Sequence, residues 1–243
     1  QMYLQYFKIF GIEKYTMRLS LHDQEGLGKK YVNEPELWIE TEKLLREALQ
    51  EGDIEFVEVP GEAAFYGPKI DFHVEDAIGR RHQCATIQVD FVQAECFDLH
   101  YAAEDGTRKR PVLIHRAILG SFERFMAMLI EHTAGVFPVW LAPVQIGVLP
   151  ISDKHHDYAK EVTAILKQQG LRVTLDVRNE KIGRKIREAQ LQKVPFMLVT
   201  GDKEVESRTV AVRHRRDGDQ GQKELKVFIE EIKVLINEKS LIA

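Results

Sequence analysis

The chain has 243 residues, of which 44% are hydrophobic and 30% charged, with a formal net charge of −4 at neutral pH. This composition is typical of a soluble globular protein with one large or two ordinary domains. No apolar run approaches the ~20 residues of a membrane span, and no basic, apolar and small-residue succession marks a signal peptide. The net charge does not by itself indicate a nucleic-acid binder, but the distribution of charge matters more than its sum.

The chain contains two cysteines, Cys84 and Cys96, and no Cys-x-x-Cys pair. This usage argues against a disulfide framework or a cysteine-built metal site, and it favours a reducing, cytoplasmic environment. The chain opens with Gln-Met-Tyr-Leu rather than with methionine, so we expect it to be a piece of a longer protein.

The first half of the chain predicts helices and antiparallel strands. In chain order we expect a helix end at 3–10, a strand at 14–19, a helix from 33 through 49, strands at 54–59, 69–74 and 85–92, and a helix from about 117 to 133. Asn33, Glu34 and Pro35 supply the start of the second helix, and Gly135 stops the last. Apolar and polar side chains alternate in the strands 69–74 and 85–92, which predicts one apolar and one polar sheet face.

The pattern changes after the break at 137–143. We expect strands at 144–149, 171–177, 196–200 and 209–215, and helices at 155–169, 183–193 and 225–239. Strands that alternate with helices indicate a mainly parallel sheet covered by helices. The sequence therefore predicts two domains that join near residue 140.

The polar face of the first sheet is a candidate site. Its predicted members are Lys69, Asp71, His73, Gln83, Thr86 and Gln88. A sheet face that simply meets water would explain this pattern equally well. Two features favour a site: the turn at 65–69 brings an aromatic hydroxyl and an ammonium to one end of the strand, and His115, Arg116 and Arg124 follow on the next element.

The head of the predicted helix 117–133 has the features of an anion site. Gly120 and Ser121 allow another group to approach the backbone closely, and the free N–H groups there favour an anion. Arg124 is predicted about two turns into this apolar helix, where an unpaired charge is costly. We therefore expect it to have a partner, and a phosphate is a natural one.

Five segments in fixed order resemble one family. YGPKIDF (66–72), QCATIQVDF (83–91) and HRAILGSFERF (115–125) are similar to the C-terminal part of the catalytic domain of threonyl-tRNA synthetases, and HRAILGSFERF resembles their class II motif 3. RNEKIGRKIR (178–187) and VTGDKEVESRTVAVR (199–213) resemble the family's anticodon-binding domain. The resemblance implies an α/β fold: in residues 1–140 part of the antiparallel sheet and helices of a class II synthetase, and in residues 141–243 a mainly parallel α/β anticodon-binding domain.

The resemblance also implies a reaction and its residues. Threonine is activated with ATP and Mg²⁺ to threonyl-adenylate and then transferred to the 3′ end of threonine tRNA. By the resemblance, Lys69 and Arg124 are catalytic, and Tyr66 and Gln88 line the threonine pocket. Attack of a carboxylate on the α-phosphate accumulates negative charge, which cations stabilise without a protein nucleophile.

The nucleotide and metal contacts follow in the same way. Gln83, Ser121 and Arg124 are implied to bind ATP, and His115 matches one of three protein ligands of a Zn²⁺ that selects the threonine hydroxyl. The other two ligands, motifs 1 and 2 and the editing domain have no counterpart in this sequence. We expect them upstream of Gln1, and we expect the isolated chain to be inactive. The resemblance further implies a homodimer of the full-length enzyme and no membrane partner.

The second half concentrates positive charge between residues 178 and 216, although the chain as a whole is acidic. The basic residues there are Arg178, Lys181, Arg184, Lys185, Arg187, Lys193, Lys203, Arg208, Arg213, Arg215 and Arg216. This clustering predicts an RNA-binding patch. The residues that match the family's anticodon-facing positions are Asn179, Lys181, Arg187, Glu204 and Arg213; amide and carboxylate groups suit single-stranded bases, which are recognised through their Watson–Crick edges.

Two alternatives remain at this point. One is a prolyl, glycyl or histidyl synthetase, which shares the fold of the second domain; YGPKIDF and HRAILGSFERF count against it. The other is a non-catalytic nucleic-acid-binding relative, such as a polymerase accessory subunit. Retention of Tyr66, Lys69, Gln88, His115 and Arg124 argues against such a loss of catalysis.

Overall fold

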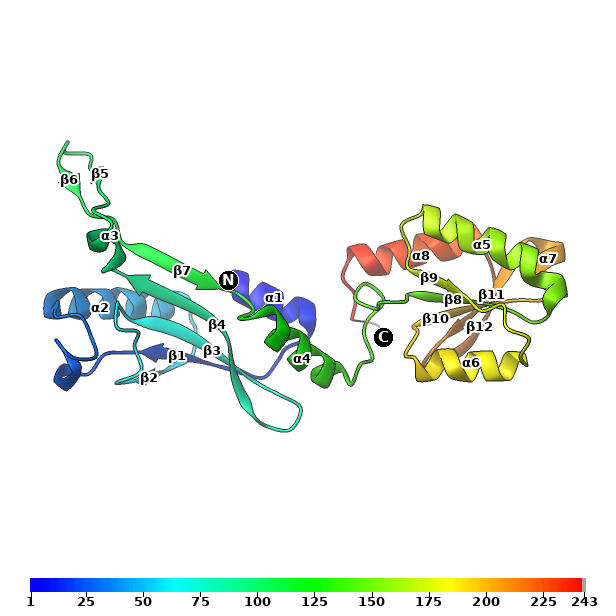
Figure 1. The fold of residues 1–243 in the computed structure, drawn as a ribbon, viewed down its shortest axis with the longest axis horizontal. Coiled ribbons are helices and arrows are strands. Elements are labelled where there is room, and N and C mark those ends of the chain that lie inside the picture. The colour runs from blue at the N-terminus through cyan, green and yellow to red at the C-terminus, as the bar shows by residue number, and fades with distance from the viewer. Residues whose placement is uncertain (242–243) are drawn as a thin grey trace. The chain divides into compact units, whose positions relative to one another are not determined.

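The computed structural model describes residues 1–241 and divides into two compact units, Gln1–His132 and Thr133–Ala243 (Figure 1). The segment after His132 belongs to the second unit because its residues pack there. Val139 is fully buried in that unit's core, and Gln145 donates to its carbonyl oxygen at 2.9 Å. Among the described residues, no helix is long and apolar enough to cross a bilayer.

The first unit is built on a five-stranded sheet of order β2-β1-β3-β4-β7, in which only the pair β1–β2 is parallel. The strands are β1 (Tyr15–Ser20), β2 (Phe56–Val59), β3 (Lys69–Glu75), β4 (Arg81–Asp90) and β7 (Leu113–Ala117). The helices are α1 (Met2–Phe10), α2 (Pro35–Glu51), α3 (Gln93–Cys96) and α4 (Phe122–Thr133), with a 3-10 turn at Gln24–Gly26. A small hairpin pairs β5 (Tyr101–Ala102) with β6 (Arg108–Lys109).

Aromatic contacts hold α1 on the apolar face of this sheet. The ring of Tyr3 stacks on Phe72 with the centroids 4.7 Å apart, and Phe7 meets Phe72 edge-on at 5.8 Å. The three side chains are at most 4% exposed. The alternation predicted for β3 is thus confirmed, with Phe72 on the helix-covered face and Lys69 and Asp71 on the other.

The prediction of one helix from Ala117 to Thr133 is wrong in its first part. Leu113–Ala117 forms β7, which pairs antiparallel with β4 so that His115 lies opposite Gln88. Gly120 then turns with φ +69, and the helix begins only at Phe122. The β-branched and apolar residues of this stretch fit an edge strand as well as a helix, and pairing with β4 decides between them. His115 and Arg116 therefore lie on a strand.

The second unit contains a five-stranded sheet of order β12-β11-β10-β8-β9. Strands β8 (Ile146–Pro150), β9 (Val173–Leu175) and β10 (Phe196–Thr200) are parallel; β11 (Thr209–His214) and β12 (Gly218–Glu224) are antiparallel additions at one edge. The helices are α5 (His156–Gln168, after a 3-10 turn at Asp153–His155), α6 (Ile182–Leu191), α7 (Asp202–Ser207) and α8 (Leu225–Asn237). Strand β12 and helix α7 were not predicted from the sequence.

The two faces of this sheet carry different helices. Helices α5 and α8 cover one face, where Val148, Val210 and Val212 are fully buried with Phe228 and Ile232 of α8. Helix α6 covers part of the other face, where Ala189 packs against Leu149 and Met197 (Figure 1). The alternating strand–helix pattern thus gives the mainly parallel α/β layer arrangement that the sequence predicted.

Candidate functional site

A buried carboxylate organises the polar face of the first sheet. Asp71, on β3, is 3% exposed. One carboxylate oxygen lies 2.8 Å from the Lys69 ammonium and accepts from the Ser20 hydroxyl at 3.0 Å. The other accepts from the Thr86 hydroxyl at 3.0 Å and from the Gln83 amide at 2.5 Å. A carboxylate with four donors satisfies the requirement for burying a charge, so this face is an ordered polar cluster rather than a merely wetted surface.

A second chain of contacts crosses the same face toward β7. The Tyr66 hydroxyl donates to the Gln88 amide oxygen, and the Gln88 amide nitrogen lies 3.3 Å from the Thr86 hydroxyl. The Tyr66 and His115 rings are 5.8 Å apart. Burial raises the pKa of Tyr66, and the nearby carboxylates of Asp90 and Asp71 add to this. Tyr66 therefore stays protonated near neutral pH and acts as a hydrogen-bond donor.

The corner that precedes β3 requires a glycine. Gly67 has φ +158, and a Cβ there would lie 2.0 Å from the backbone oxygen of Val89. Strands β3 and β4 can therefore approach at this point only because residue 67 lacks a side chain. This close approach brings Tyr66 and Lys69 to the end of the sheet that also carries Gln88, as the sequence predicted.

The start of α4 differs from the expectation for Arg124. The residue lies in the first turn of the helix and is exposed, not two turns inside an apolar environment. The Arg124 guanidinium makes one long hydrogen bond, from Nη1 to the Gln83 backbone oxygen at 3.4 Å. The Arg124 backbone N–H lies 3.3 Å from the Ser121 hydroxyl oxygen. The guanidinium thus lies beside Gln83, the Ser121 hydroxyl contacts the Arg124 backbone, and no described carboxylate pairs with the guanidinium.

His115 is oriented by a buried acid that sequence analysis missed. Its Nε2 lies 2.8 Å from the Asp90 carboxylate, whose side chain is fully buried, while the His115 side chain is 43% exposed. The other Asp90 oxygen accepts from the N–H groups of Val92 and Gln93, both at 2.9 Å. A histidine held through one nitrogen by a carboxylate presents the other nitrogen in a fixed direction, as metal-bound histidines do.

The described part of the chain does not assemble a metal site by itself. Within residues 1–241, no group of three or more His, Cys, Asp and Glu side chains could hold a metal ion. A tetrahedral zinc needs about four donors. His115 fits as one ligand of such an ion, but the described residues do not complete the set.

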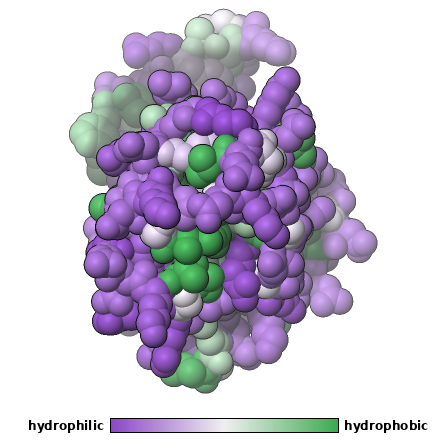
Figure 2. All heavy atoms as spheres, turned by 90° about the vertical axis from the view of Figure 1, so that its right-hand side faces the viewer, coloured by the Kyte–Doolittle hydropathy of each residue, from purple (hydrophilic) through white to green (hydrophobic). Residues whose placement is uncertain are grey.

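In the second unit, several predicted RNA-contacting residues lie at one end of the sheet. Asn179 and Lys181 follow the carboxyl end of β9, and Lys203 follows the carboxyl end of β10; all three side chains are exposed. Because β9 and β10 both flank β8 in parallel, these loops share the end of the sheet where open α/β sheets bind ligands. Figure 2 shows a mostly hydrophilic surface with a small hydrophobic area near its centre.

The three other residues predicted to face the anticodon differ in their surroundings. Arg213 pairs with Met197 across β10 and β11, so it lies on the face of the sheet that α6 partly covers, and its Nε is buried with no partner among the described residues. Arg187 is exposed on α6. Glu204 is 8% exposed; its carboxylate accepts from the Gly201 N–H at 2.9 Å and from the Gln222 amide at 2.5 Å. The structure thus gives Glu204 a helix-capping role.

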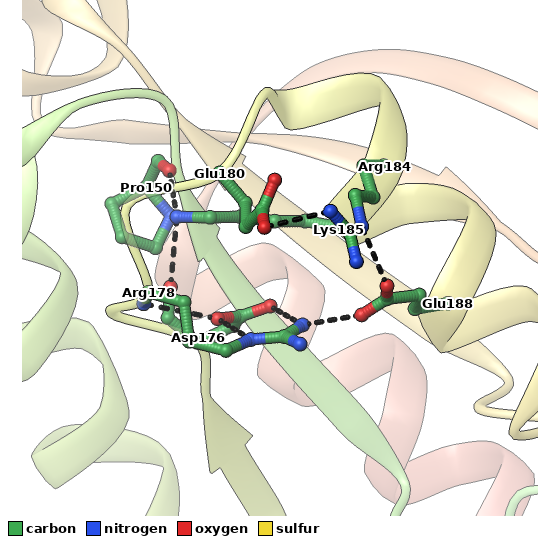
Figure 3. Close-up of polar contacts among 7 residues, drawn as sticks. All are labelled: Pro150, Asp176, Arg178, Glu180, Arg184, Lys185 and Glu188. Carbon is green, nitrogen blue, oxygen red and sulfur yellow. Dashed lines mark hydrogen bonds and ion pairs between the residues drawn. The ribbon is translucent and has the colours of Figure 1, made fainter.

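Three of the eleven cations in the predicted basic patch, Arg178, Arg184 and Arg208, pair with carboxylates within the protein, and two more donate to backbone oxygens. Arg178 pairs with Asp176 at 2.6 Å and with Glu188 at 2.7 Å, and Arg184 pairs with Glu180 at 2.8 Å and with Glu188 at 2.9 Å (Figure 3). Arg208 pairs with Glu161, Arg215 donates to the backbone oxygens of Phe137 and Lys193, and Lys185 is buried. The predicted patch therefore holds fewer unpaired cations than the sequence count indicates, because charge counted along the sequence does not show which side chains are paired.

Comparison with known proteins identifies the family. Residues 1–133 match the family described as "tRNA synthetase class II core domain (G, H, P, S and T)", and residues 145–235 match the "Anticodon binding domain". The chain belongs to the class II tRNA synthetases. This membership agrees with the resemblance found in the sequence and excludes an unrelated fold.

The chain is also similar to individual proteins whose names include one amino acid, threonine. The chain is 53% identical, over 96% of its length, to a protein of Acetivibrio thermocellus named threonine–tRNA ligase, and 49% identical to one of Natranaerobius thermophilus with the same name. It spans 36% of the length of each of these relatives. The crystal structure of the RNA binding domain of threonyl-tRNA synthetase from Cryptosporidium parvum matches 96% of this chain and 57% of that one, at 37% identity and a TM-score of 0.89.

Proposed function

We propose that this chain is the part of a threonine–tRNA ligase that joins the end of the catalytic domain to the anticodon-binding domain. The observation that carries the proposal is the identity of about half of its residues, over 96% of its length, with proteins named threonine–tRNA ligase. Because the chain spans about a third of those relatives, the activity belongs to a protein of their full length. That protein activates threonine with ATP and Mg²⁺ and transfers it to threonine tRNA.

On this proposal, the polar face of the first unit binds threonine and ATP. Tyr66 and Gln88 form one side of the amino-acid pocket, and their mutual hydrogen bond supports this assignment. Lys69 lies beside the reacting carboxylate and phosphate, where its charge stabilises the transition state. The pairing of Lys69 with Asp71 supports this role because it fixes the ammonium at the end of the sheet.

The same face provides the nucleotide contacts. The guanidinium of Arg124 binds ATP, and its freedom from any carboxylate partner among the described residues supports a phosphate as its ligand. Gln83 lies beside the guanidinium and its amide donates to Asp71, and Ser121 contacts the Arg124 backbone N–H at the start of the same helix. No proton transfer by the protein is required, because positioning and charge stabilisation suffice for phosphoryl chemistry.

We further propose that His115 is one ligand of a zinc ion whose remaining ligands come from residues outside this chain. The fixed orientation of its ring by Asp90 supports the proposal. The second unit binds the anticodon through Asn179, Lys181, Arg187 and Arg213, and Glu204 acts through the start of α7 that it caps. The homodimer and the cytoplasmic location implied by the family belong to the same proposal.

Two substitutions in a protein of full length test the catalytic assignments. His115→Ala is expected to remove zinc, measured by metal analysis, together with threonine activation. Arg124→Ala is expected to weaken ATP binding with the zinc content unchanged. Stoichiometric zinc in the His115 variant would reject the ligand assignment, and a defect confined to threonine binding in the Arg124 variant would reject the nucleotide role.

A further inference from the structure

One of the cations in the basic run is buried beneath α6. Lys185 is 2% exposed, and its ammonium donates to the backbone oxygens of Pro150 and Asp176, both at 3.0 Å (Figure 3). An ammonium is tolerated in the interior only where acceptors replace its water. Lys185 therefore has a role inside the protein and contacts no RNA phosphate.

The two acceptors of Lys185 lie where neighbouring strands separate. Pro150 is the last residue of β8, and Asp176 follows the last residue of β9. The Asp176 N–H still donates to the Val148 oxygen at 3.0 Å, which is the last bond between these segments. Beyond this last bond, Lys185 connects the ends of β8 and β9 through its ammonium. It thereby fixes the point at which the loop 176–181 leaves the sheet.

Charged side chains attach the rest of this loop to the same helix. Arg178 reaches Glu188 at 2.7 Å, and Glu180 pairs with Arg184, which also contacts Glu188 (Figure 3). The residues on both sides of Asn179 are thus held by α6. Among the described residues, the side chains of Asn179 and Lys181 have no hydrogen-bond or ion-pair partner, and both are exposed.

We propose that Lys185 is a positioning residue for anticodon recognition. Its buried ammonium fixes the ends of β8 and β9, and Glu188 adds an outer contact, so that α6 holds the loop with Asn179 and Lys181 extended toward RNA. The inference rests on the proposed anticodon-binding function. A loop that is ordered before binding loses less conformational freedom when a base arrives, and its polar groups keep the geometry that distinguishes one base from another.

The experiment uses the 243-residue chain and two RNA stem-loops, one with a threonine anticodon and one with the anticodon exchanged. The wild-type chain is expected to prefer the threonine stem-loop by roughly tenfold or more, as one good base contact provides. Lys185→Met is expected to reduce this preference to about threefold or less. Its affinity for the exchanged stem-loop stays within about twofold of wild type, because Lys185 contacts no phosphate.

Lys160→Met is the matched control, since Lys160 lies exposed on α5 and its loss removes the same charge. This variant is expected to keep the wild-type preference. Glu188→Gln removes only surface contacts and leaves the core intact, so a reduction of about threefold is expected there. If circular dichroism shows that Lys185→Met does not fold, the stem-loop preference of Glu188→Gln tests the inference in its place.

Four results separate failure of this inference from failure of the proposed function. A folded Lys185→Met chain with the full wild-type preference would overturn the inference, as would an unchanged preference in Glu188→Gln where the methionine variant does not fold. An equal weakening of both stem-loops in Lys185→Met would also overturn it, because the residue would then act on affinity alone. Equal binding of both stem-loops by the wild-type chain would reject the anticodon proposal itself; hydrogen exchange at the Asn179 amide, expected to be faster in Lys185→Met, would still decide whether Lys185 orders the loop.

Discussion

Asp71→Asn is expected to destabilise the first unit, because Asp71 is the one acceptor shared by Lys69, Ser20, Thr86 and Gln83. Asparagine keeps the shape but removes the charge and turns an N–H₂ group toward two of these donors. Hydrogen bonds to a charged group contribute about 1.5–3 kcal/mol, and breaking a buried ion pair costs about 3–5 kcal/mol. Lys69 keeps slight solvent access at 16% side-chain exposure, so we expect a loss of about 3 kcal/mol in the free energy of unfolding.

Urea unfolding followed by tryptophan fluorescence measures this loss. The chain has two tryptophans, one in each unit, so a Trp140→Phe background leaves the buried Trp38 as the reporter of the first unit. Glu104→Gln removes an equal charge from an exposed position and is expected to change stability by less than about 0.5 kcal/mol. Adding Lys69→Gln to Asp71→Asn should cost less than Lys69→Gln alone. A variant within about 0.5 kcal/mol of the background, or fully additive substitutions, would refute the reasoning.

The remaining predictions concern the close approach of β3 and β4 and the acid stability of the second unit. Gly67→Ala should lower the free energy of unfolding by more than about 3 kcal/mol, because its Cβ would meet the Val89 carbonyl. Gly79→Ala is the control: this residue also has positive φ but lies in open space, so the loss should be about 1 kcal/mol. Equal losses for the two variants in urea unfolding would contradict this reasoning. The hydrogen bond from Arg178 holds the pKa of Asp176 below its usual value. The stability from this pair is therefore present above about pH 4 and lost as pH falls through the lowered pKa. In acid unfolding of the second unit, the Asp176→Asn variant should lose this part of the pH dependence of stability. Identical pH–stability profiles for the variant and the wild type would be evidence against the pair.

The sequence predicted the sheet faces well because alternation depends on local periodicity. The strand with Lys69, Asp71 and His73 on one side lies as expected, and the corner at Gly67 delivers Tyr66 and Lys69 together. The depth of a polar residue could not be predicted in the same way. Asp71 is more deeply buried than the pattern suggests because donors from other strands converge on it, and those partners are distant in sequence.

The errors have a common physical cause, which is that tertiary partners decided the outcome. The helix expected from about residue 117 begins only at Phe122, because Leu113–Ala117 pairs with the edge of β4 as β7 and places His115 opposite Gln88. The strand β12 carries no apolar alternation that would have predicted it. Lys185 looked like its neighbours in a basic run, and only the carbonyl ends of β8 and β9 distinguish it as an interior residue.

The most direct test of the central claim is amino-acid-dependent ATP–pyrophosphate exchange, measured on a protein of the relatives' full length that contains this segment. The family profile covers several amino-acid specificities, so threonine should be compared with proline, glycine, histidine and serine under the same conditions. Threonine is expected to support the fastest exchange, and proline, glycine and histidine are expected to give rates near background. Serine, which shares the hydroxyl but lacks the methyl group, is expected to be slower than threonine. Exchange with proline, glycine or histidine in place of threonine, or no exchange with threonine in a folded preparation that binds ATP, would contradict the account.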